Sequence, residues 1–150
     1  MKKILFVCLG NICRSPSAEA VFAAKAQAAC YPVIVDSAGT GNWHVGEPPY
    51  GPMQQAAQRR GYDLSSLRAR QITASDFEGF DLIVAMDEAN LRDIERLRPS
   101  GSETPVTLMM SYAPETGERA VPDPYYTRDF DEALNLIEAA ANGLLASLTN

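Results

Sequence analysis

The start of the chain constrains its fold most strongly, because a short apolar run leads through a loop into the start of a helix. Residues 4–8 read Ile-Leu-Phe-Val-Cys, which is typical of a strand buried on both faces of a sheet. After the loop, Ser15 and Pro16 suit the N-cap and the first position of a helix. The sequence therefore predicts a strand, loop and helix unit whose free backbone N–H groups would bind an anion such as phosphate.

Two side chains distinguish this loop from a simple anion site. Cys8 begins it and Arg14 ends it, with five residues between them. A helix N-terminus and a nearby cation favour the thiolate form of a cysteine, which is the nucleophilic form. A guanidinium can hold two phosphate oxygens at once, whereas a lysine ammonium cannot. The spacing therefore favours phosphoryl transfer to the sulfur of Cys8.

Each of these residues has a simpler interpretation when it is considered alone. Cys8 and Cys13 would then be small buried side chains, and Arg14 a surface charge. A nucleotide-binding P-loop fits less well, because it needs more glycine than the single Gly10 and a Gly-Lys-Ser/Thr ending. The combination of the three residues, after a strand and before a helix, favours the catalytic interpretation.

Composition favours one domain without a nucleic-acid or membrane partner. A chain of 150 residues with 46% hydrophobic content suffices for one core, so we expect a single domain over residues 1–150. A net charge of −6, without clustered Lys and Arg, argues against nucleic acid. The first apolar run is too short for a signal peptide, and no transmembrane segment is expected. Three cysteines argue against a disulfide framework, so we expect a cytoplasmic protein.

The rest of the chain alternates short apolar runs with segments of helical pattern. Further strands are expected at residues 33–35, 81–85 and 106–110. Helices are expected at residues 18–29, from Pro52 to before Gly61, near Thr73 and Asp76, after a cap at Asp87, and after a cap at Asp129 with Glu132. This order indicates an α/β fold with a parallel sheet and helices on both faces. Ligands of such sheets bind beyond the carboxyl ends of the strands, where Cys8 is expected.

Several motifs give the sequence a specific resemblance to a known family. Residues 8–15, Cys-Leu-Gly-Asn-Ile-Cys-Arg-Ser, are similar to the signature of the low-molecular-weight protein tyrosine phosphatases. Segments at 36–40, 43–46, 69–72, 86–91 and 123–126 match the family in order, over essentially the whole chain. The resemblance implies a four-stranded twisted parallel sheet, the phosphotyrosine phosphatase I-like and Rossmann-like fold. It also implies hydrolysis of phosphotyrosine and aryl phosphates through a cysteinyl phosphate, with no metal or other cofactor.

The resemblance also implies roles for individual residues. Cys8 would be the nucleophile, Arg14 the phosphate ligand and Asp123 the general acid that later activates water. The single histidine, His44, is another candidate acid, and Pro-Asp-Pro is by default an ordinary turn. The phosphate-binding loop would comprise Leu9, Gly10, Asn11, Ile12, Cys13 and Ser15.

The family also suggests how this loop is supported and protected. Asn11 tolerates a left-handed backbone and would hold the loop through side-chain hydrogen bonds, with Ser37 as one partner. Ser15 would hydrogen-bond the thiolate. Many relatives have a further supporting histidine where this chain has Leu67, so the rigidity of the loop is in question. The resemblance implies that Cys13 is a redox partner that forms a reversible disulfide with Cys8.

The expected substrate follows from the residues that match the walls of the family's cleft, which are Ile12, Trp43, Tyr125 and Tyr126. Arginine phosphatases of this fold tend to carry threonine at the position of Ile12, so Ile12 favours phosphotyrosine. A second departure lies at residues 49–52, Pro-Tyr-Gly-Pro, where the family often has Pro-Asp-Pro-Arg. This departure could hold the Trp43 loop differently or add an aromatic contact.

Partners and alternatives complete the expectation. A phosphotyrosine-containing protein, such as a tyrosine kinase, would be the partner of a monomer or weak homo-oligomer. An arsenate reductase of the same fold would need a cysteine pair that residues 80–97 lack. A phosphate- or phosphopeptide-binding module without turnover would not need the carboxyl of Asp123.

Overall fold

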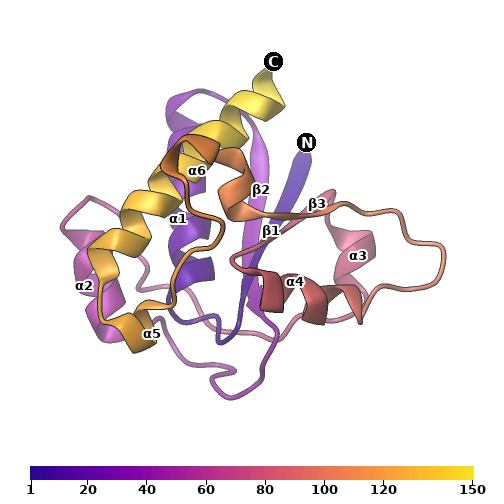
Figure 1. Cartoon of the computed structure of the whole chain (residues 1–150), viewed down its shortest axis with the longest axis horizontal. Helices are drawn as coiled ribbons and strands as arrows, with labels where there is room; N and C mark the ends of the chain where they lie inside the picture. The colour runs from indigo at the N-terminus through magenta and orange to yellow at the C-terminus, as the bar shows by residue number, and fades with distance from the viewer.

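The first apolar run forms the central strand of a four-stranded parallel sheet. The computed structural model describes residues 1–150, with strands β1 (Lys2–Cys8), β2 (Val33–Gly39), β3 (Leu82–Ala85) and β4 (Val106–Leu108) (Figure 1). Their order in the sheet is β2-β1-β3-β4. All three pairings are parallel, and Cys8 of β1 lies opposite Gly39 of β2. The predicted α/β fold class is confirmed.

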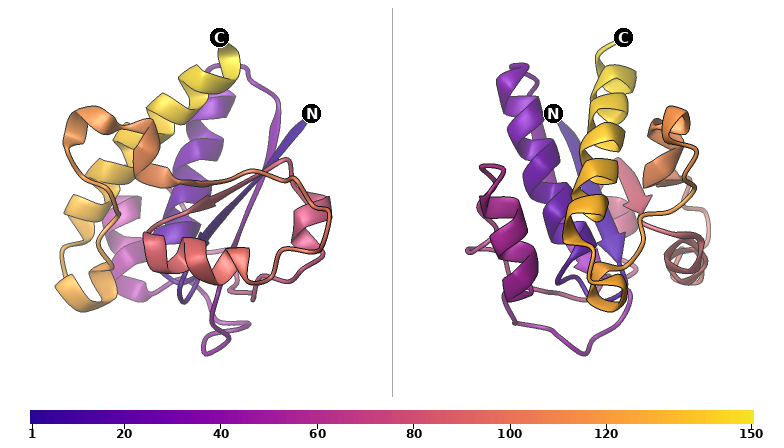
Figure 2. Two further views of the ribbon diagram at one scale, coloured as in Figure 1. Left: turned by 45° about the vertical axis from the view of Figure 1, so that its right-hand side comes forward. Right: turned by 60° about the vertical axis from the view of Figure 1, so that its left-hand side comes forward.

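Helices cover both faces of this sheet. They are α1 (Arg14–Ala28), α2 (Gly51–Gln58), α3 (Asp76–Gly79), α4 (Glu88–Glu95), α5 (Pro124–Thr127) and α6 (Phe130–Thr149). Figure 2 shows α1 and α6 side by side on one side of the sheet and α3 and α4 on the other. Two short 3₁₀ helices, Met109–Tyr112 and Pro114–Thr116, follow β4.

The side chains of β1 alternate between two apolar clusters. Ile4, Phe6 and Cys8 pack in the larger cluster with residues of α1 and α6. Leu5 and Val7 pack in the smaller cluster with residues of α3 and α4. Because both faces are covered, the strand is apolar throughout instead of alternating with polar residues.

The carboxyl ends of the strands meet at the end of the molecule opposite the two termini, beside α5 and the loop before α2 (Figure 1). A Cβ atom at Gly39 would lie 2.7 Å from the carbonyl oxygen of Leu9. Glycine therefore lets the end of β2 approach the loop that follows Cys8. No helix is long and apolar enough to cross a membrane.

Some predicted boundaries were wrong. Ser15 is not the N-cap of α1, which begins at Arg14 without any side-chain cap, and Pro16 is its third residue. Strand β2 extends to Gly39 because its polar second half pairs with β1. Strand β4 ends at Leu108 because a 3₁₀ helix begins at Met109. The N-caps Asp87 and Asp129 are confirmed, since their side chains accept hydrogen bonds from the N–H groups three residues later.

Candidate active site

The sulfur of Cys8 lies at the end of β1, inside the loop that leads into α1. Its side chain is buried, and the backbone N–H groups of Asn11 and Ser15 donate to Sγ at 3.3 and 3.4 Å. The hydroxyl of Ser15 lies 3.0 Å from the same sulfur. This contact explains why Ser15 does not cap the helix. Two backbone N–H groups and one hydroxyl therefore converge on this sulfur.

Asn11 holds the loop in a left-handed turn. Its φ is 56°, and its amide nitrogen donates to the hydroxyls of Ser15 at 2.7 Å and Ser37 at 3.0 Å. Its amide oxygen accepts from the backbone N–H of Arg70 at 3.0 Å. The predicted partner Ser37 is therefore in place, and three separate segments hold one buried side chain.

The support behind Asn11 continues to a carboxyl group that the sequence reading did not identify. The hydroxyl of Ser37 donates to Oε1 of Glu19 at 2.7 Å. Burial raises the pKa of Glu19 to about 6. Leu67, where the resemblance led us to expect a supporting histidine, is half-buried and lines a groove beside Glu19. The loop is thus supported by Ser37, Glu19 and the Arg70 backbone.

The guanidinium of Arg14 is buried and held from one side. Its Nη1 donates to Oδ2 of Asp87 at 2.7 Å and to the carbonyl of Val121 at 3.0 Å. Its Nη2 lies 3.4 Å from Oδ2 of Asp123, and its buried Nε has no partner. Burial alone would lower the pKa of Arg14, but the Cys8 sulfur and the two carboxylates outweigh it and raise the pKa. Arg14 therefore stays charged, with Nε and Nη2 available to an anion.

Asp123 lies at the start of α5, a short helix that was not predicted. Its Oδ1 accepts from the backbone N–H of Tyr125 at 3.1 Å, and its Oδ2 faces Arg14. The side chain is 24% exposed, so water reaches the carboxylate. Prolines on both sides stiffen this segment. The acid candidate therefore has a fixed position beside the phosphate-binding loop.

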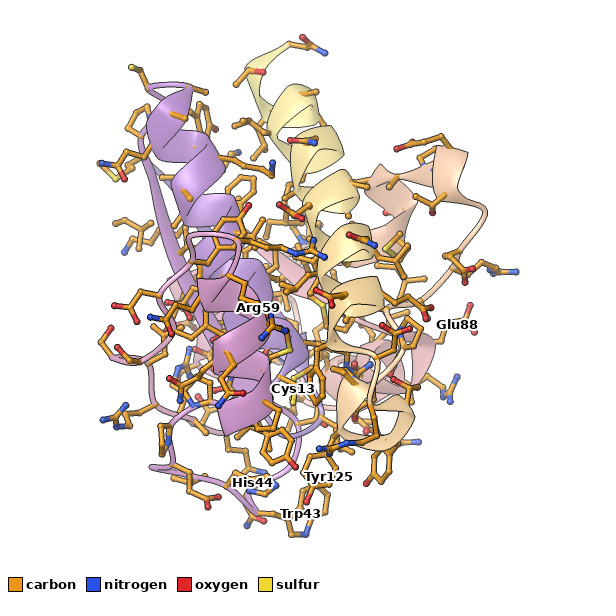
Figure 3. All side chains as sticks on the ribbon, turned by 90° about the vertical axis from the view of Figure 1, so that its left-hand side faces the viewer. Cys13, Trp43, His44, Arg59, Glu88 and Tyr125 are labelled. Carbon is orange, nitrogen blue, oxygen red and sulfur yellow. The ribbon has the colours of Figure 1, made fainter.

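A cleft of about 270 Å³ joins these groups. Its lining contains every residue predicted for the cleft and most of the loop: Cys8, Leu9, Gly10, Ile12, Cys13, Arg14, Trp43, His44, Asp123, Tyr125 and Tyr126. In Figure 3, Trp43, His44 and Tyr125 gather at one end of the molecule, and Cys13 lies further inward. Trp43 is 69% and Tyr126 is 73% exposed, so both rings stand at the rim.

Two further side chains of the loop region have defined surroundings. His44 lines the cleft, and its Nδ1 lies 2.6 Å from Oε2 of Glu47. The structure therefore brings Asp123, and not His44, into contact with Arg14. Cys13 is a buried free thiol, and burial followed by the charge of Cys8 raises its pKa. No group of three or more His, Cys, Asp and Glu side chains is arranged to hold a metal ion.

Two supports of the site, Asp87 and Glu19, were not predicted from the sequence. Asp87 was predicted only as a helix cap, although its other carboxylate oxygen holds Arg14. Its place after β3, a neighbour of β1, was the available signal, because the carboxyl ends of adjacent parallel strands meet. Glu19 gave no comparable signal, because its partner Ser37 lies in a distant segment.

Comparisons with known proteins agree with this geometry. The family model described as low molecular weight phosphotyrosine protein phosphatase matches residues 3–150. The low molecular weight protein-tyrosine-phosphatase YfkJ of Bacillus subtilis is 40% identical, covering 99% of this chain and 96% of its own. The low molecular weight protein-tyrosine-phosphatase of Streptomyces coelicolor is 46% identical, covering 97% and 93%.

Solved structures agree as well. The crystal structure of YfkJ matches with a TM-score of 0.94 at 38% identity, covering 99% of this chain and 95% of that one. A Drosophila arginine phosphatase matches with a TM-score of 0.92 at 33% identity, covering 100% and 99%. The whole-length family match, the identities of the relatives and the buried cysteine loop lead to one conclusion. The chain belongs to the low molecular weight phosphotyrosine protein phosphatase family.

Proposed function

We propose that this protein removes phosphate from phosphotyrosine in other proteins, with Cys8 as nucleophile, Arg14 as phosphate ligand and Asp123 as acid and base. The observation that carries the proposal is the arrangement around one buried sulfur. Two backbone N–H groups point at Sγ, and Arg14, whose buried Nε has no partner, lines the same cleft as Cys8. Asp123 then lies within 3.4 Å of Nη2 of Arg14.

In the first step, the thiolate of Cys8 attacks phosphorus, so that a P–S bond forms while the P–O bond to the tyrosine breaks. The carboxylic acid of Asp123 gives its proton to the departing phenolic oxygen. Arg14 and the loop N–H groups hold the three other phosphate oxygens, whose charge they stabilise.

In the second step, the carboxylate of Asp123 takes a proton from water. The hydroxide formed in this way attacks phosphorus while the P–S bond breaks. The electron pair of that bond stays on sulfur, so that Cys8 leaves as a thiolate. The hydroxyl of Ser15, 3.0 Å from Sγ, stabilises this leaving sulfur. Inorganic phosphate is the second product.

Phosphotyrosine is the substrate that fits the walls. Trp43, Tyr125 and Tyr126 border a cleft that has the reactive sulfur in its lining, and aromatic rings attract each other edge to face or offset. A fold match alone does not separate tyrosine from arginine phosphatases, because the Drosophila arginine phosphatase has the same fold. Ile12 supports tyrosine, since its apolar side chain lines the cleft.

The alternatives are weaker. An arsenate reductase needs further cysteines near the nucleophile, and besides Cys13 the chain has only Cys30, which follows the far end of α1. A binding module without turnover would not need a carboxylate beside Arg14. Both alternatives predict no catalytic hydrolysis of an aryl phosphate.

The test is hydrolysis of aryl phosphates by the wild type, Cys8→Ser and Asp123→Asn, each with and without a chelator. We expect Cys8→Ser to be inactive and the wild type to be unaffected by the chelator. Asp123→Asn should lose most activity on esters with poor leaving groups, because these need the proton most. Turnover by Cys8→Ser would reject the mechanism, and equal loss on all esters would reject Asp123 as the acid.

We also propose that Cys13 protects the nucleophile. Peroxide oxidises Cys8 to a sulfenic acid, and the Cys13 thiol condenses with it, releasing water and forming a disulfide that a thiol reductant opens. The raised pKa of Cys13 keeps it protonated until then. Peptide mapping after peroxide should find Cys8 linked to Cys13, and finding only overoxidised Cys8 would remove this role.

We place the protein in a reducing compartment, the cytoplasm, where the free thiols of Cys8, Cys13 and Cys30 stay reduced. A tyrosine kinase that carries phosphotyrosine is the proposed partner, and a monomer or weak homo-oligomer the proposed state. Sedimentation over a range of concentrations tests that state, since a stable dimer at low concentration would contradict it.

A further inference from the structure

We propose that Tyr50 is a positioning residue for Asp123, and that the guanidinium of Arg128 binds the Tyr50 side chain to the segment that carries this acid. The inference rests on the proposed function of Asp123. Tyr50 belongs to the Pro-Tyr-Gly-Pro segment that departs from the family pattern. Tyr50 connects the phosphate-binding loop with α5. These two segments are distant in the sequence, since Arg14 and Asp123 are 109 residues apart.

The backbone of Tyr50 is fixed to the phosphate-binding loop. Its N–H donates to the carbonyl of Ile12 at 2.8 Å, and its carbonyl accepts from Gln54 in the first turn of α2 at 2.9 Å. The side-chain amide of Gln54 also donates to the carbonyl of Pro49 at 2.7 Å. These hydrogen bonds tie the backbone of Tyr50 both to the loop that surrounds Cys8 and to α2.

The ring of Tyr50 supports the acid segment directly. It lies 5.1 Å from the ring of Tyr125, at an interplanar angle of 57°, within the range of favourable aromatic pairs. The N–H of the same Tyr125 donates to Oδ1 of Asp123 at 3.1 Å. A chain of two contacts thus runs from the phosphate-binding loop to the carboxylate.

Arg128, at the other end of α5, also contacts Tyr50. Its Nη1 donates to the Tyr50 hydroxyl at 2.9 Å and to the carbonyl of Tyr125 at 3.4 Å. Its guanidinium lies over the rings of Tyr50 and Phe130, at 5.2 and 5.3 Å from their centroids. Arg128 ends α5 with a left-handed φ of 64°, which turns the chain toward α6. The guanidinium therefore contacts both rings, whose own centroids lie 6.2 Å apart.

Helix α5 needs this support, because a helix of four residues is not stable alone. The side chains of residues 125–128 are exposed. A cavity of about 220 Å³ borders Tyr125 and Tyr50, so Tyr125 is not packed on that side. The contact between Asp123 and Arg14, at 3.4 Å, is long for a hydrogen bond. The ring of Tyr125 has Tyr50 beside it at 5.1 Å and His44 at 6.4 Å, so Tyr50 is the nearer of these two supports of the residue whose N–H holds the carboxylate.

A loosened acid has a characteristic kinetic effect. Cys8 and Arg14 do not depend on Tyr50 side-chain atoms, so attack on phosphorus continues. Only protonation of the leaving group becomes slower. This lowers the rate for phenyl phosphate, which has a poor leaving group, and has little effect on p-nitrophenyl phosphate, which has a good one. Loss of Tyr50 should therefore reproduce part of the effect of Asp123→Asn.

The experiment compares kcat/KM on phenyl phosphate and p-nitrophenyl phosphate for Tyr50→Ala, Tyr50→Phe and Arg128→Asn. Asparagine tolerates the left-handed backbone of Arg128, so that variant removes the guanidinium and its contacts without straining the backbone. For Tyr50→Ala we expect a loss of about tenfold on phenyl phosphate, a fraction of the total contribution of an acid, and about twofold on p-nitrophenyl phosphate. Tyr50→Phe and Arg128→Asn should lose about threefold on phenyl phosphate only, as for one exposed hydrogen bond.

Tyr112→Phe is the matched control. Its hydroxyl also has a hydrogen bond, to Thr107 at 2.8 Å, but it lies outside the cleft lining. The kcat/KM of Tyr112→Phe should equal that of the wild type on both esters. If Tyr50→Ala fails to fold, Tyr50→Phe and Arg128→Asn decide the question, since both keep the ring at position 50 and its contact with Tyr125.

Asp123→Asn separates failure of this inference from failure of the proposed function. If Asp123→Asn is selective for phenyl phosphate but the Tyr50 and Arg128 variants lose equally on both esters or not at all, the positioning role is overturned. If Asp123→Asn itself shows no selectivity, the assignment of the acid is overturned first. In the double variant Tyr50→Ala with Asp123→Asn, the Tyr50 effect should disappear, and full additivity would contradict positioning.

Discussion

At the scale of residues, Arg14 uses one side of its guanidinium for structure and leaves the other side for the phosphate of the proposed substrate. Asp87 and the carbonyl of Val121 occupy Nη1, whereas Nε is buried without a partner. A buried N–H group without a partner costs free energy, which a phosphate oxygen recovers on binding. This division needs a planar group with several fixed donors, which only arginine provides.

Arg14→Lys should therefore lower kcat/KM for aryl phosphates by about 10² to 10³, as for loss of a donor to developing charge. A single ammonium cannot reach Asp87 and also hold two phosphate oxygens. Steady-state kinetics measure the loss, and Arg59→Lys, an exposed residue outside the cleft, is the control. Retention of activity within about threefold would contradict bidentate phosphate binding.

Glu19 makes the stability of the fold depend on pH. Burial raises its pKa from 4.5 to about 6 in the folded protein, so the folded chain holds this proton more tightly than the unfolded chain. The resulting stabilisation is fully present below pH 4.5 and is lost as pH rises through about 6. Because Glu19 is partly exposed, we expect a loss of about 1 kcal/mol.

Glu19→Gln keeps the acceptor for Ser37 but removes the titration. Urea unfolding of both proteins between about pH 4.5 and about pH 7 measures the free energy of unfolding. The variant should gain about 1 kcal/mol relative to the wild type over this range. Parallel pH profiles would contradict the account of Glu19.

At the scale of elements, local sequence patterns predicted the cores of the strands and the capped helices, and contacts between distant segments decided the rest. Asp87 and Asp129 were correct as caps because capping is local. Ser15 was wrong because its hydroxyl contacts the sulfur of Cys8 across the loop. Helix α5 was missed because Pro-Asp-Pro is also a turn signal, and Tyr50 and Arg128 support it from outside.

The candidate site divides in the same way. Cys8, Arg14 and Asp123 were predicted because motifs mark them, and the structure brings them together. Glu19 acts on these residues through a contact that no spacing in the sequence indicates. The signals for Asp87 and Tyr50 were the place after β3 and the unusual segment at residues 49–52, neither of which names a partner.

Helix α6 packs closely against the 3₁₀ helix Met109–Tyr112 at Gly143. A Cβ atom at Gly143 would overlap the carbonyl oxygen of Tyr112, in the 3₁₀ helix that α6 covers. Gly143→Ala should lower the free energy of unfolding by about 1 to 3 kcal/mol, despite the better helix propensity of alanine. Urea unfolding measures this change. Gly79→Ala, where a Cβ atom meets nothing within 4 Å, is the control, and equal stability of both variants would contradict the packing.

At the scale of the whole molecule, the sheet brings separate parts of the chain to one end. Strand β1 ends at Cys8, β3 leads to Asp87, and the segment before α6 carries Asp123. The net charge of −6 repels an anionic substrate, so attraction must come from Arg14 and the N–H groups of the loop. The proposed function therefore requires local recognition of phosphate, within a cleft of about 270 Å³.

The central claim is that phosphate passes through the sulfur of Cys8. Rapid mixing with an aryl phosphate labelled with ³²P, followed by acid quenching and peptide mapping, tests it most directly. The account predicts a transient label on the peptide that contains Cys8, and none in Cys8→Ser. Label on another residue, or hydrolysis by the wild type with no labelled peptide at any time, would contradict it.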